Sequence, residues 1–400
     1  MIIRYTTENF YSIRESVTVD FTVSAKAGDR EGLIPTERGY KVNTVTGVFG
    51  ANASGKTNLL KSLGFLSWFV RDSGSRNPDE RIPYEPFAFT LGRLEPTKFE
   101  LEFEYGGELY LYQLDLLDEA VAWEALYIKK SRFNFLFKRI LNIETGDYDF
   151  TSQELGQVAF VPQRANASWL SSALLQEHEL ALRLQPFFAN IFGNLGPSGR
   201  VPIHDAIGPN MLTAADFYQR NPESLAVVSN LLSEFDLGLS GIEVKQSKVI
   251  ELDGKEGERP LPFFLHTLEG NEYRLGLMQE SHGTQTLFIL LRYLVPVLQK
   301  GGVAYVDELE TGLHPHMVCR ILDLFFNPAT NPKQAQLIAT FHTDFLLRDT
   351  LNKYQIYFTE KDDTLSTDAY RLDSVRGVRN VDNIYEKYHA GAYGGIPELF

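Results

Sequence analysis

The chain has 400 residues, of which 44% are hydrophobic and 22% are charged, with a formal net charge of −14. This composition is typical of a folded globular protein, and the length allows one large domain with an insertion or two domains. The negative charge argues against broad attraction to nucleic acid, and the single cysteine, Cys319, excludes a disulfide framework and a thiolate zinc cluster.

The sequence carries no pattern that predicts a membrane segment. The N-terminal residues have no apolar signal-peptide core. The apolar run at residues 287–298 contains Arg292 and is shorter than the roughly 20 residues that a membrane span needs. We expect this run to be a buried helix, and we expect a cytoplasmic protein without a membrane partner.

The first part of the chain alternates between strands and one helix. Residues 2–13 and 17–23 are predicted to be strands, and residues 45–49 are predicted to be a buried strand that runs into a glycine-containing loop. A helix is expected from Lys56, because leucines then recur on one face. Residues 97–140 alternate around Gly106 and Gly107, which predicts antiparallel strands.

The rest of the chain changes character twice. Helical periodicity predicts a helical insertion near residues 165–235, and strand–helix alternation after residue 241 predicts a parallel α/β sheet. We therefore divide the chain into a first lobe at residues 1–160, a helical insertion at 161–240 and a second lobe at 241–400. The expected fold is α/β, with a mixed central sheet, an antiparallel β subdomain and the helical insertion.

The loop after the strand at residues 45–49 fits the phosphate-loop pattern G-x-x-x-x-G-K-[ST]. Backbone N–H groups and the helix N-terminus would hold phosphates, Lys56 would reach the β- and γ-phosphates, and Thr57 would ligate Mg²⁺. The alternative is a glycine-rich turn without a ligand, which the strand before and the helix after disfavour. The predicted ATP-binding residues here are Gly50, Asn52, Ala53, Ser54, Gly55, Lys56, Thr57 and Asn58.

A second apolar strand, residues 303–306, ends in two carboxylates. Asp307 is predicted to lie beside the metal, and Glu308 to hold or deprotonate an attacking water. The structural alternative is a strand that ends in a polar turn. The long separation between Lys56 and Asp307 is unlike a GTPase or small kinase, where the two motifs lie much closer in sequence.

Two further motifs accompany these carboxylates. His342 follows another apolar strand and could contact the γ-phosphate or the attacking water, although such a histidine is often structural. Ser281 and Gly283 stand at the start of a predicted helix, where they could bind phosphate or could form an ordinary helix cap.

The order of these motifs resembles the ABC-type ATPase superfamily, and within it the OLD-like ATPases of the RecF/SMC branch. "ESHGTQ" would be a degenerate signature motif in which Ser281 and Gly283 match and His282 replaces the usual first glycine. "LETGLHPH" resembles the D-loop, and His342 matches the switch histidine. "ENFYSIRES" and "YHAGAYGGIPEL" are similar to segments of stand-alone ATPases of anti-phage defence and abortive-infection operons, such as the RloA, AbiL-type and PARIS ATPases.

The resemblance implies how the protein would work. The signature Ser281 would bind the γ-phosphate held by a second copy, so the chain would act as a homodimer or higher homo-oligomer with ATP at the interface. The sequence up to Phe400 has no TOPRIM-like nuclease pattern of the kind that OLD nucleases carry, so we expect a separate effector, with a nuclease as one candidate and a phage protein as a candidate trigger.

One element departs from the family pattern, and two other functions stay open. A Q-loop glutamine is absent near Phe87, and Gln163 is a candidate that could equally be a plain loop amide. A RecF-like DNA-maintenance ATPase is the main alternative, with DNA as partner, and a metabolic kinase is a third. The DNA-binding hypothesis depends on one segment that is rich in basic and aromatic residues. Its basic side chains could equally lie on solvent-exposed faces of strands. They are Lys129, Lys130, Arg132, Lys138 and Arg139.

Overall fold

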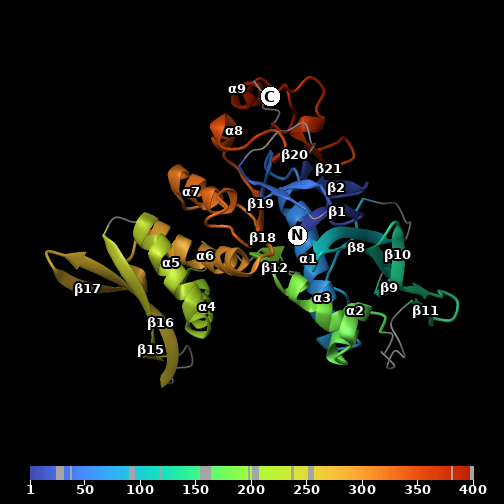
Figure 1. Cartoon of the computed structure of the whole chain (residues 1–400), viewed down its shortest axis with the longest axis horizontal. Helices are drawn as coiled ribbons and strands as arrows, with labels where there is room; N and C mark the ends of the chain where they lie inside the picture. The colour runs from blue at the N-terminus through green and yellow to red at the C-terminus, as the bar shows by residue number, and fades with distance from the viewer. Residues whose placement is uncertain are drawn as a thin grey trace.

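The structure is a computed structural model of the chain, which is arranged around two β-sheets (Figure 1). Among the described helices, none is long and apolar enough to cross a membrane. The described residues are 1–23, 31–36, 38–89, 95–117, 119–153, 164–196, 199–200, 207–235, 238–250, 256–379 and 382–396.

A six-stranded sheet forms the centre of the ATPase-like core. Five of its strands are parallel, and β21 joins antiparallel at one edge, so the sheet is mixed as the sequence predicts. The inner strands are almost wholly apolar and buried, because helices cover a parallel sheet on its faces. In spatial order the strands are β12 (Ile191–Gly193), β18 (Val303–Val306), β19 (Gln336–Thr340), β6 (Val45–Gly50), β20 (Ile356–Lys361) and β21 (Thr367–Arg371).

A seven-stranded antiparallel sheet forms the predicted β subdomain. Its strands alternate buried and partly exposed side chains, because one face packs on the core and the other faces solvent. In spatial order they are β11 (Tyr148–Ser152), β10 (Phe133–Leu141), β9 (Ala120–Lys129), β8 (Glu108–Leu117), β7 (Thr97–Tyr105), β1 (Ile2–Glu8) and β2 (Val17–Asp20).

Helix α1 (Lys56–Asp72) lies between the two sheets and joins their cores. Its buried apolar face shares one hydrophobic cluster with strands of both sheets. A direct polar tie adds to this packing: the Gln336 side chain accepts from the Ile2 N–H at 2.7 Å and donates to the Ile2 carbonyl at 3.0 Å. The phosphate-loop helix is therefore held from both sides.

The segment predicted as one helical insertion is divided between two cores. Helices α2 (Trp169–Leu175) and α3 (Glu179–Ala189) pack against α1, whereas α4 (Ile207–Arg220) and α5 (Pro222–Phe235) pack against α6 (His282–Lys300). Strand β12 lies between these pairs in sequence and adds to the edge of the central sheet beside β18. Because the sequence predicts a helical insertion near residues 165–235, this three-residue strand corrects that expectation.

The second half of the chain supplies an extended β arm and the remaining helices. Strands β15 (Leu239–Ile250), β16 (Glu256–Leu268) and β17 (Asn271–Gly276) form a separate three-stranded sheet that lies against α4 and α5 (Figure 1). The turn between β15 and β16 lies outside the described residues. The remaining elements are β3 (Thr22–Val23), β4 (Leu33–Pro35), β5 (Lys41–Asn43), η2 (Ser73–Ser75), β13 (Leu195–Gly196), β14 (Gly199–Arg200), η3 (Leu277–Gln279), α7 (Pro315–Phe326), α8 (Leu346–Asp349), η4 (Leu372–Ser374) and α9 (Ile384–His389).

Candidate functional site

The phosphate loop connects the end of β6 to the start of α1, as the sequence predicts. Its backbone needs glycine at both ends. Gly55 has φ of 106°, and a Cβ there would lie 2.1 Å from the Thr367 hydroxyl oxygen; Gly50 has φ of 152°, and a Cβ there would lie 2.4 Å from the Thr359 carbonyl. Such contacts exclude a side chain at either position, so the loop packs directly against β20 and β21.

Lys56 folds back over this loop. Its Nζ donates hydrogen bonds to the carbonyl oxygens of Gly50 at 2.7 Å and Ala51 at 3.0 Å. Burial lowers the pKa of Lys56, while the nearby carboxylates of Asp307, Glu310 and Glu308 act in the opposite direction. The cation therefore lies inside the loop and among the acidic residues that follow β18.

Thr57 meets the distant acidic motif directly. Its hydroxyl donates to both carboxylate oxygens of Asp307 at 3.1 Å. Asp307 is buried, with only 3% of its surface exposed, and its Oδ1 also accepts from the Thr340 hydroxyl at 2.8 Å. The fold thus brings together two residues that stand 250 positions apart.

Glu308 and His342 form the second pair. The His342 Nε2 atom lies 3.1 Å from Glu308 Oε1. The Glu308 backbone has φ of 54°, and its N–H donates to the Thr340 hydroxyl at 2.7 Å. A non-glycine residue in the left-handed region is uncommon and costs free energy, so the hydroxyl of Thr340 helps to hold this turn.

A cavity of about 790 Å³ opens at the phosphate loop, and both Glu308 and His342 line it. Two lining residues, Ser12 and Lys361, are absent from the sequence prediction. Ser12 accepts from the Asn58 side chain at 2.8 Å, which ties the segment after β1 to the loop. The complete lining in the described chain is Ser12, Asn52, Ala53, Ser54, Gly55, Lys56, Thr57, Asn58, Glu308, His342 and Lys361.

Ser281 and Gly283 do not line this cavity. Ser281 is exposed and caps the N-terminus of α6, where its Oγ accepts from the Thr284 N–H at 3.1 Å. Gly283 lies near Gly312, in the segment that follows the acidic pair. The D-loop candidate leads into α7, which His314 caps. Within one chain, the predicted signature motif is therefore separate from the phosphate loop.

The Q-loop position has no occupant in the described chain. Phe87 is buried, and its N–H donates to the Asn9 side chain at 2.9 Å, which makes its segment structural. Gln163 lies outside the described residues. None of the described residues that line the cavity is a glutamine.

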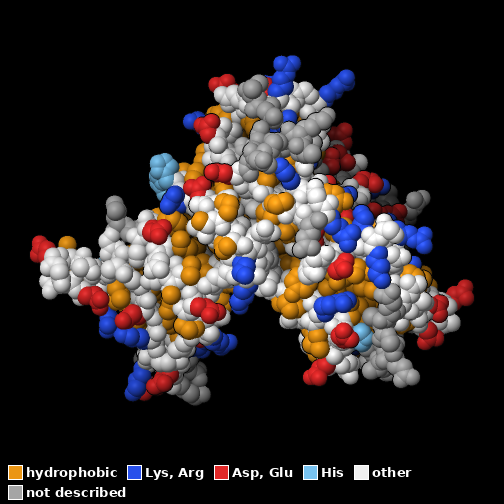
Figure 2. Space-filling model, in the orientation of Figure 1, with side chains coloured by type: hydrophobic (Ala, Val, Ile, Leu, Met, Phe, Trp, Pro, Cys, Tyr) orange, Lys and Arg blue, Asp and Glu red, His pale blue; other side chains and the backbone are white. Residues whose placement is uncertain are grey.

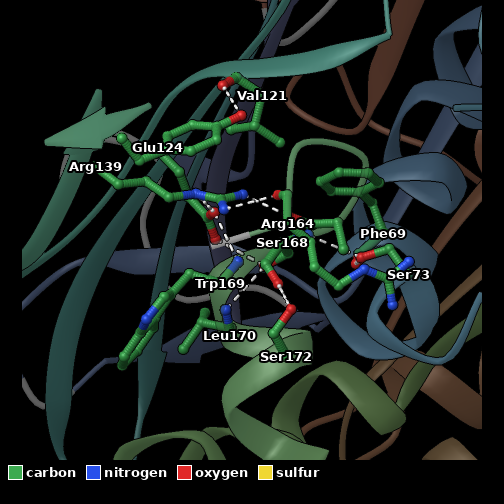
Figure 3. A network of polar contacts seen from close by, with 12 residues as sticks. Phe69, Ser73, Val121, Glu124, Arg139, Arg164, Ser168, Trp169, Leu170 and Ser172 are labelled. Carbon is green, nitrogen blue, oxygen red and sulfur yellow. Dashed lines mark hydrogen bonds and ion pairs between the residues drawn. The ribbon is translucent and has the colours of Figure 1, made fainter. Parts of the chain in front are cut away.

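Only some of the basic side chains between residues 129 and 139 lie on the surface. Arg139 is buried, so the hypothesis that it faces DNA is wrong. Arg139 has no exposed surface: it forms an ion pair with Glu124 at 2.8 Å and reaches the carbonyls of Arg164 and Ala167 (Figure 3). Successive strand residues face opposite sides of a sheet, so Arg139 points inward while Lys138 points outward, over the Phe135 ring at 4.5 Å.

The buried ion pair belongs to a network that fastens the β subdomain to α2. Glu124 accepts from the Ser168 hydroxyl at 2.7 Å and the Trp169 N–H at 2.8 Å (Figure 3). It also accepts from the Tyr112 hydroxyl at 2.8 Å. Ser73, just beyond the end of α1, accepts from the Ser168 N–H at 2.9 Å. The network therefore links the antiparallel sheet, α2 and the far end of the phosphate-loop helix.

Comparisons with known proteins agree with this arrangement. A family model described as "AAA domain, putative AbiEii toxin, Type IV TA system" matches residues 45–348, which span the phosphate loop, the acidic pair and His342. No curated protein matches the chain.

Among solved structures, the chain is similar to an SMC head bound to the C-winged helix domain of ScpA, with 13% identity and a TM-score of 0.50, covering 94% of this chain and 99% of that one. It is also similar to the SMC head domain from Thermotoga maritima, with 15% identity and a TM-score of 0.45, covering 92% and 98%. The fold is that of an ABC-type ATPase head, as predicted. Because the family match covers more than half of the chain, the chain belongs to the family described as an AAA domain of putative AbiEii toxins of type IV toxin–antitoxin systems.

Proposed function

We propose that this chain hydrolyses ATP and uses ATP-gated dimerisation to hold and release a separate effector in an anti-phage defence system. One observation carries the hydrolase assignment: Glu308 and His342 lie 3.1 Å apart in the wall of the phosphate-loop cavity, while Asp307 contacts Thr57 behind it. A carboxylate and an imidazole at this position can orient a water molecule and accept its proton.

The donor set fits ATP and Mg²⁺. The glycine-framed loop and Lys56 would hold the phosphates, and the oxygen donors of Thr57 and Asp307 are ligands that Mg²⁺ prefers. The bound metal would neutralise charge on the phosphate oxygens. Glu308 would take the proton of the attacking water, and His342 would hold the Glu308 carboxylate in place.

The separation of Ser281 from the cavity supports the dimer. Ser281 is exposed at the N-terminus of α6 and does not line the phosphate-loop cavity. In a two-fold dimer, Ser281 and Gly283 of one protomer would face the phosphates held by its partner, where the helix N-terminus favours negative charge. ATP would then close the interface, and hydrolysis would release it.

A protein effector suits this chain better than DNA. The net charge of −14 and the burial of Arg139 weaken a nucleic-acid surface. Charges of both signs are interspersed on the face in Figure 2, outside its grey atoms. The family description names a toxin–antitoxin system, and the SMC head in the solved complex binds another protein's domain. Both support a second protein as partner.

The Glu308→Gln variant tests this function. It keeps the phosphate loop, so ATP should still bind, but turnover should fall by about 100-fold or more because the amide cannot accept the proton. Light scattering after gel filtration should then show an ATP-dependent dimer. Lys56→Ala is the matched control and should stay monomeric with ATP. A Glu308→Gln variant that hydrolyses ATP at the wild-type rate would refute the assignment.

Co-purification of a neighbouring gene product tests whether a separate effector binds this chain. Salt-sensitive DNA binding that is lost when the charges of Lys129 and Lys130 are reversed would favour the RecF-like alternative.

A further inference from the structure

Glu310 is a buried carboxylate that the proposed hydrolysis does not use. It follows Asp307 and Glu308 in the turn after β18, and only 9% of its surface is exposed. Its Oε1 atom accepts hydrogen bonds from two successive backbone N–H groups, those of His342 and of Thr343, the latter at 3.2 Å. Glu310 therefore connects the acidic turn to the segment that carries the switch histidine.

These two N–H groups lie where the sheet stops supplying partners. Strand β19 ends at Thr340, and the Phe341 N–H still bonds the Val48 carbonyl of β6 at 2.9 Å. Beyond this point the N–H groups of His342 and Thr343 have no partner in the strand pairing of the sheet, so they bond another acceptor. The Glu310 carboxylate takes that place and sets the direction in which the His342 backbone leaves the sheet.

Burying the Glu310 carboxylate is unfavourable. Burial raises the pKa of Glu310, while the hydrogen bonds from the His342 and Thr343 backbone act in the opposite direction. Its second oxygen, Oε2, is buried and accepts no hydrogen bond from the described part of the chain. A buried oxygen without a partner is destabilising. Unfavourable features of this kind are concentrated at functional sites, where they fix the geometry of catalytic groups.

We infer that Glu310 is a positioning residue for the proposed hydrolysis, holding the His342 backbone so that its imidazole stays against Glu308. This inference rests on the proposed function. His342 Nε2 reaches Glu308 Oε1 at 3.1 Å, and the His342 side chain is 39% exposed. Because the ring is this open to solvent, its direction depends on the backbone from which it projects. Glu310 fixes that backbone through Oε1, and Glu310 is not itself one of the described residues that line the cavity.

Two variants separate positioning from general stability. Glu310→Ala removes the acceptor, whereas Glu310→Gln keeps an amide oxygen that can accept the same two N–H bonds. We expect Glu310→Ala to lower kcat by roughly 10- to 100-fold with less than about a 3-fold change in KM and in ATP affinity. Glu310→Gln should recover kcat to within about 3-fold of wild type. Asp382→Ala is the matched control, because Asp382 also accepts a backbone N–H, that of Arg379 at 2.8 Å, and is not among the described residues that line the cavity.

Hydrogen–deuterium exchange gives a readout that needs no turnover. The amides of His342 and Thr343 should exchange faster in Glu310→Ala by about 10-fold or more, and at nearly the wild-type rate in Glu310→Gln. Unchanged exchange in Glu310→Ala would overturn the inference, as would an unchanged kcat or an equal loss of ATP affinity. Wild-type protein that binds ATP but never hydrolyses it would instead refute the proposed function, whatever the exchange result.

Discussion

The Asn194 side chain pairs with the backbone of Asp307 in both directions: Nδ2 donates to the Asp307 carbonyl at 2.9 Å, and Oδ1 accepts from the Asp307 N–H at 2.8 Å. This amide follows β12 and extends its parallel pairing with β18 by one further step. The segment between the two lobes therefore holds the backbone of the proposed metal ligand.

Replacing this amide should weaken both stability and turnover. Asn194 is 1% exposed, and Asn194→Ala would remove both of its buried hydrogen bonds to the Asp307 backbone. We expect the free energy of unfolding to fall by about 2 kcal/mol or more, and turnover to fall because Asp307 can shift. Urea unfolding followed by tryptophan fluorescence measures the first effect. Asn134→Ala is the control, because the Asn134 side chain donates to the Arg132 carbonyl in an exposed hydrogen bond. Equal unfolding midpoints for the two variants would show that the Asn194 pairing has no structural role.

Substitutions in the buried ion pair of the β subdomain should strongly lower the stability of the protein. Arg139 and Glu124 have no exposed side-chain surface, so Arg139→Met leaves a buried carboxylate without its cation. We expect the free energy of unfolding to fall by about 3–5 kcal/mol. The double variant with Glu124→Gln should recover part of this loss, because the uncompensated charge is gone.

The neighbouring lysine supplies the control for that experiment. Lys138 lies on the same strand but on the opposite face, over the Phe135 ring. Lys138→Met should change the free energy of unfolding by about 1 kcal/mol or less. If Arg139→Met and Lys138→Met lowered the free energy of unfolding equally, the buried Arg139–Glu124 pair would have no special role in stability.

Asp115 predicts a specific pH dependence of stability. Burial raises the pKa of Asp115 to about 6, with Lys98 acting in the opposite direction. The folded chain thus binds this proton more tightly than the unfolded chain, whose aspartates titrate near pH 4. As pH rises from about 4 to about 6, the unfolded state loses the proton first, and the free energy of unfolding falls.

Asp115→Asn should remove this loss. The side chain is partly solvated, so we expect a gain of only about 1 kcal/mol at about pH 7.5, and no gain at about pH 4. Urea unfolding at the two pH values measures the difference. Asp149→Asn, at an exposed carboxylate on β11, should have no such pH-dependent effect. A gain that is the same at both pH values would contradict the assignment.

The parts of the site that the sequence predicts are those encoded locally. The phosphate loop is a contiguous pattern between an apolar strand and a helix, and the Asp307–Glu308 and His342 motifs each end a buried strand. The carboxyl ends of parallel strands meet at one edge of a sheet, so their convergence at the cavity follows from the pattern.

The parts that the sequence does not reveal depend on contacts between distant segments. Asn194, Thr340 and Glu310 bond to residues at least 32 positions away, and no local pattern marks them. Arg139 illustrates a different difficulty. Strand alternation separates Lys138 from Arg139, but only the packed sheet decides which of the two faces is buried.

The central claim is that Ser281 of one chain completes the site of another, and mixing two inactive variants tests it most directly. Lys56→Ala removes the phosphate-loop cation, and Ser281→Asp keeps a helix-capping side chain while placing negative charge toward the phosphates. Each variant alone should hydrolyse almost no ATP. In an equal mixture, half of the dimers pair the two variants, and each such dimer has one intact site of two, so ATPase activity should rise to roughly a quarter of the wild-type value. A mixture that stays as inactive as its components would contradict the account.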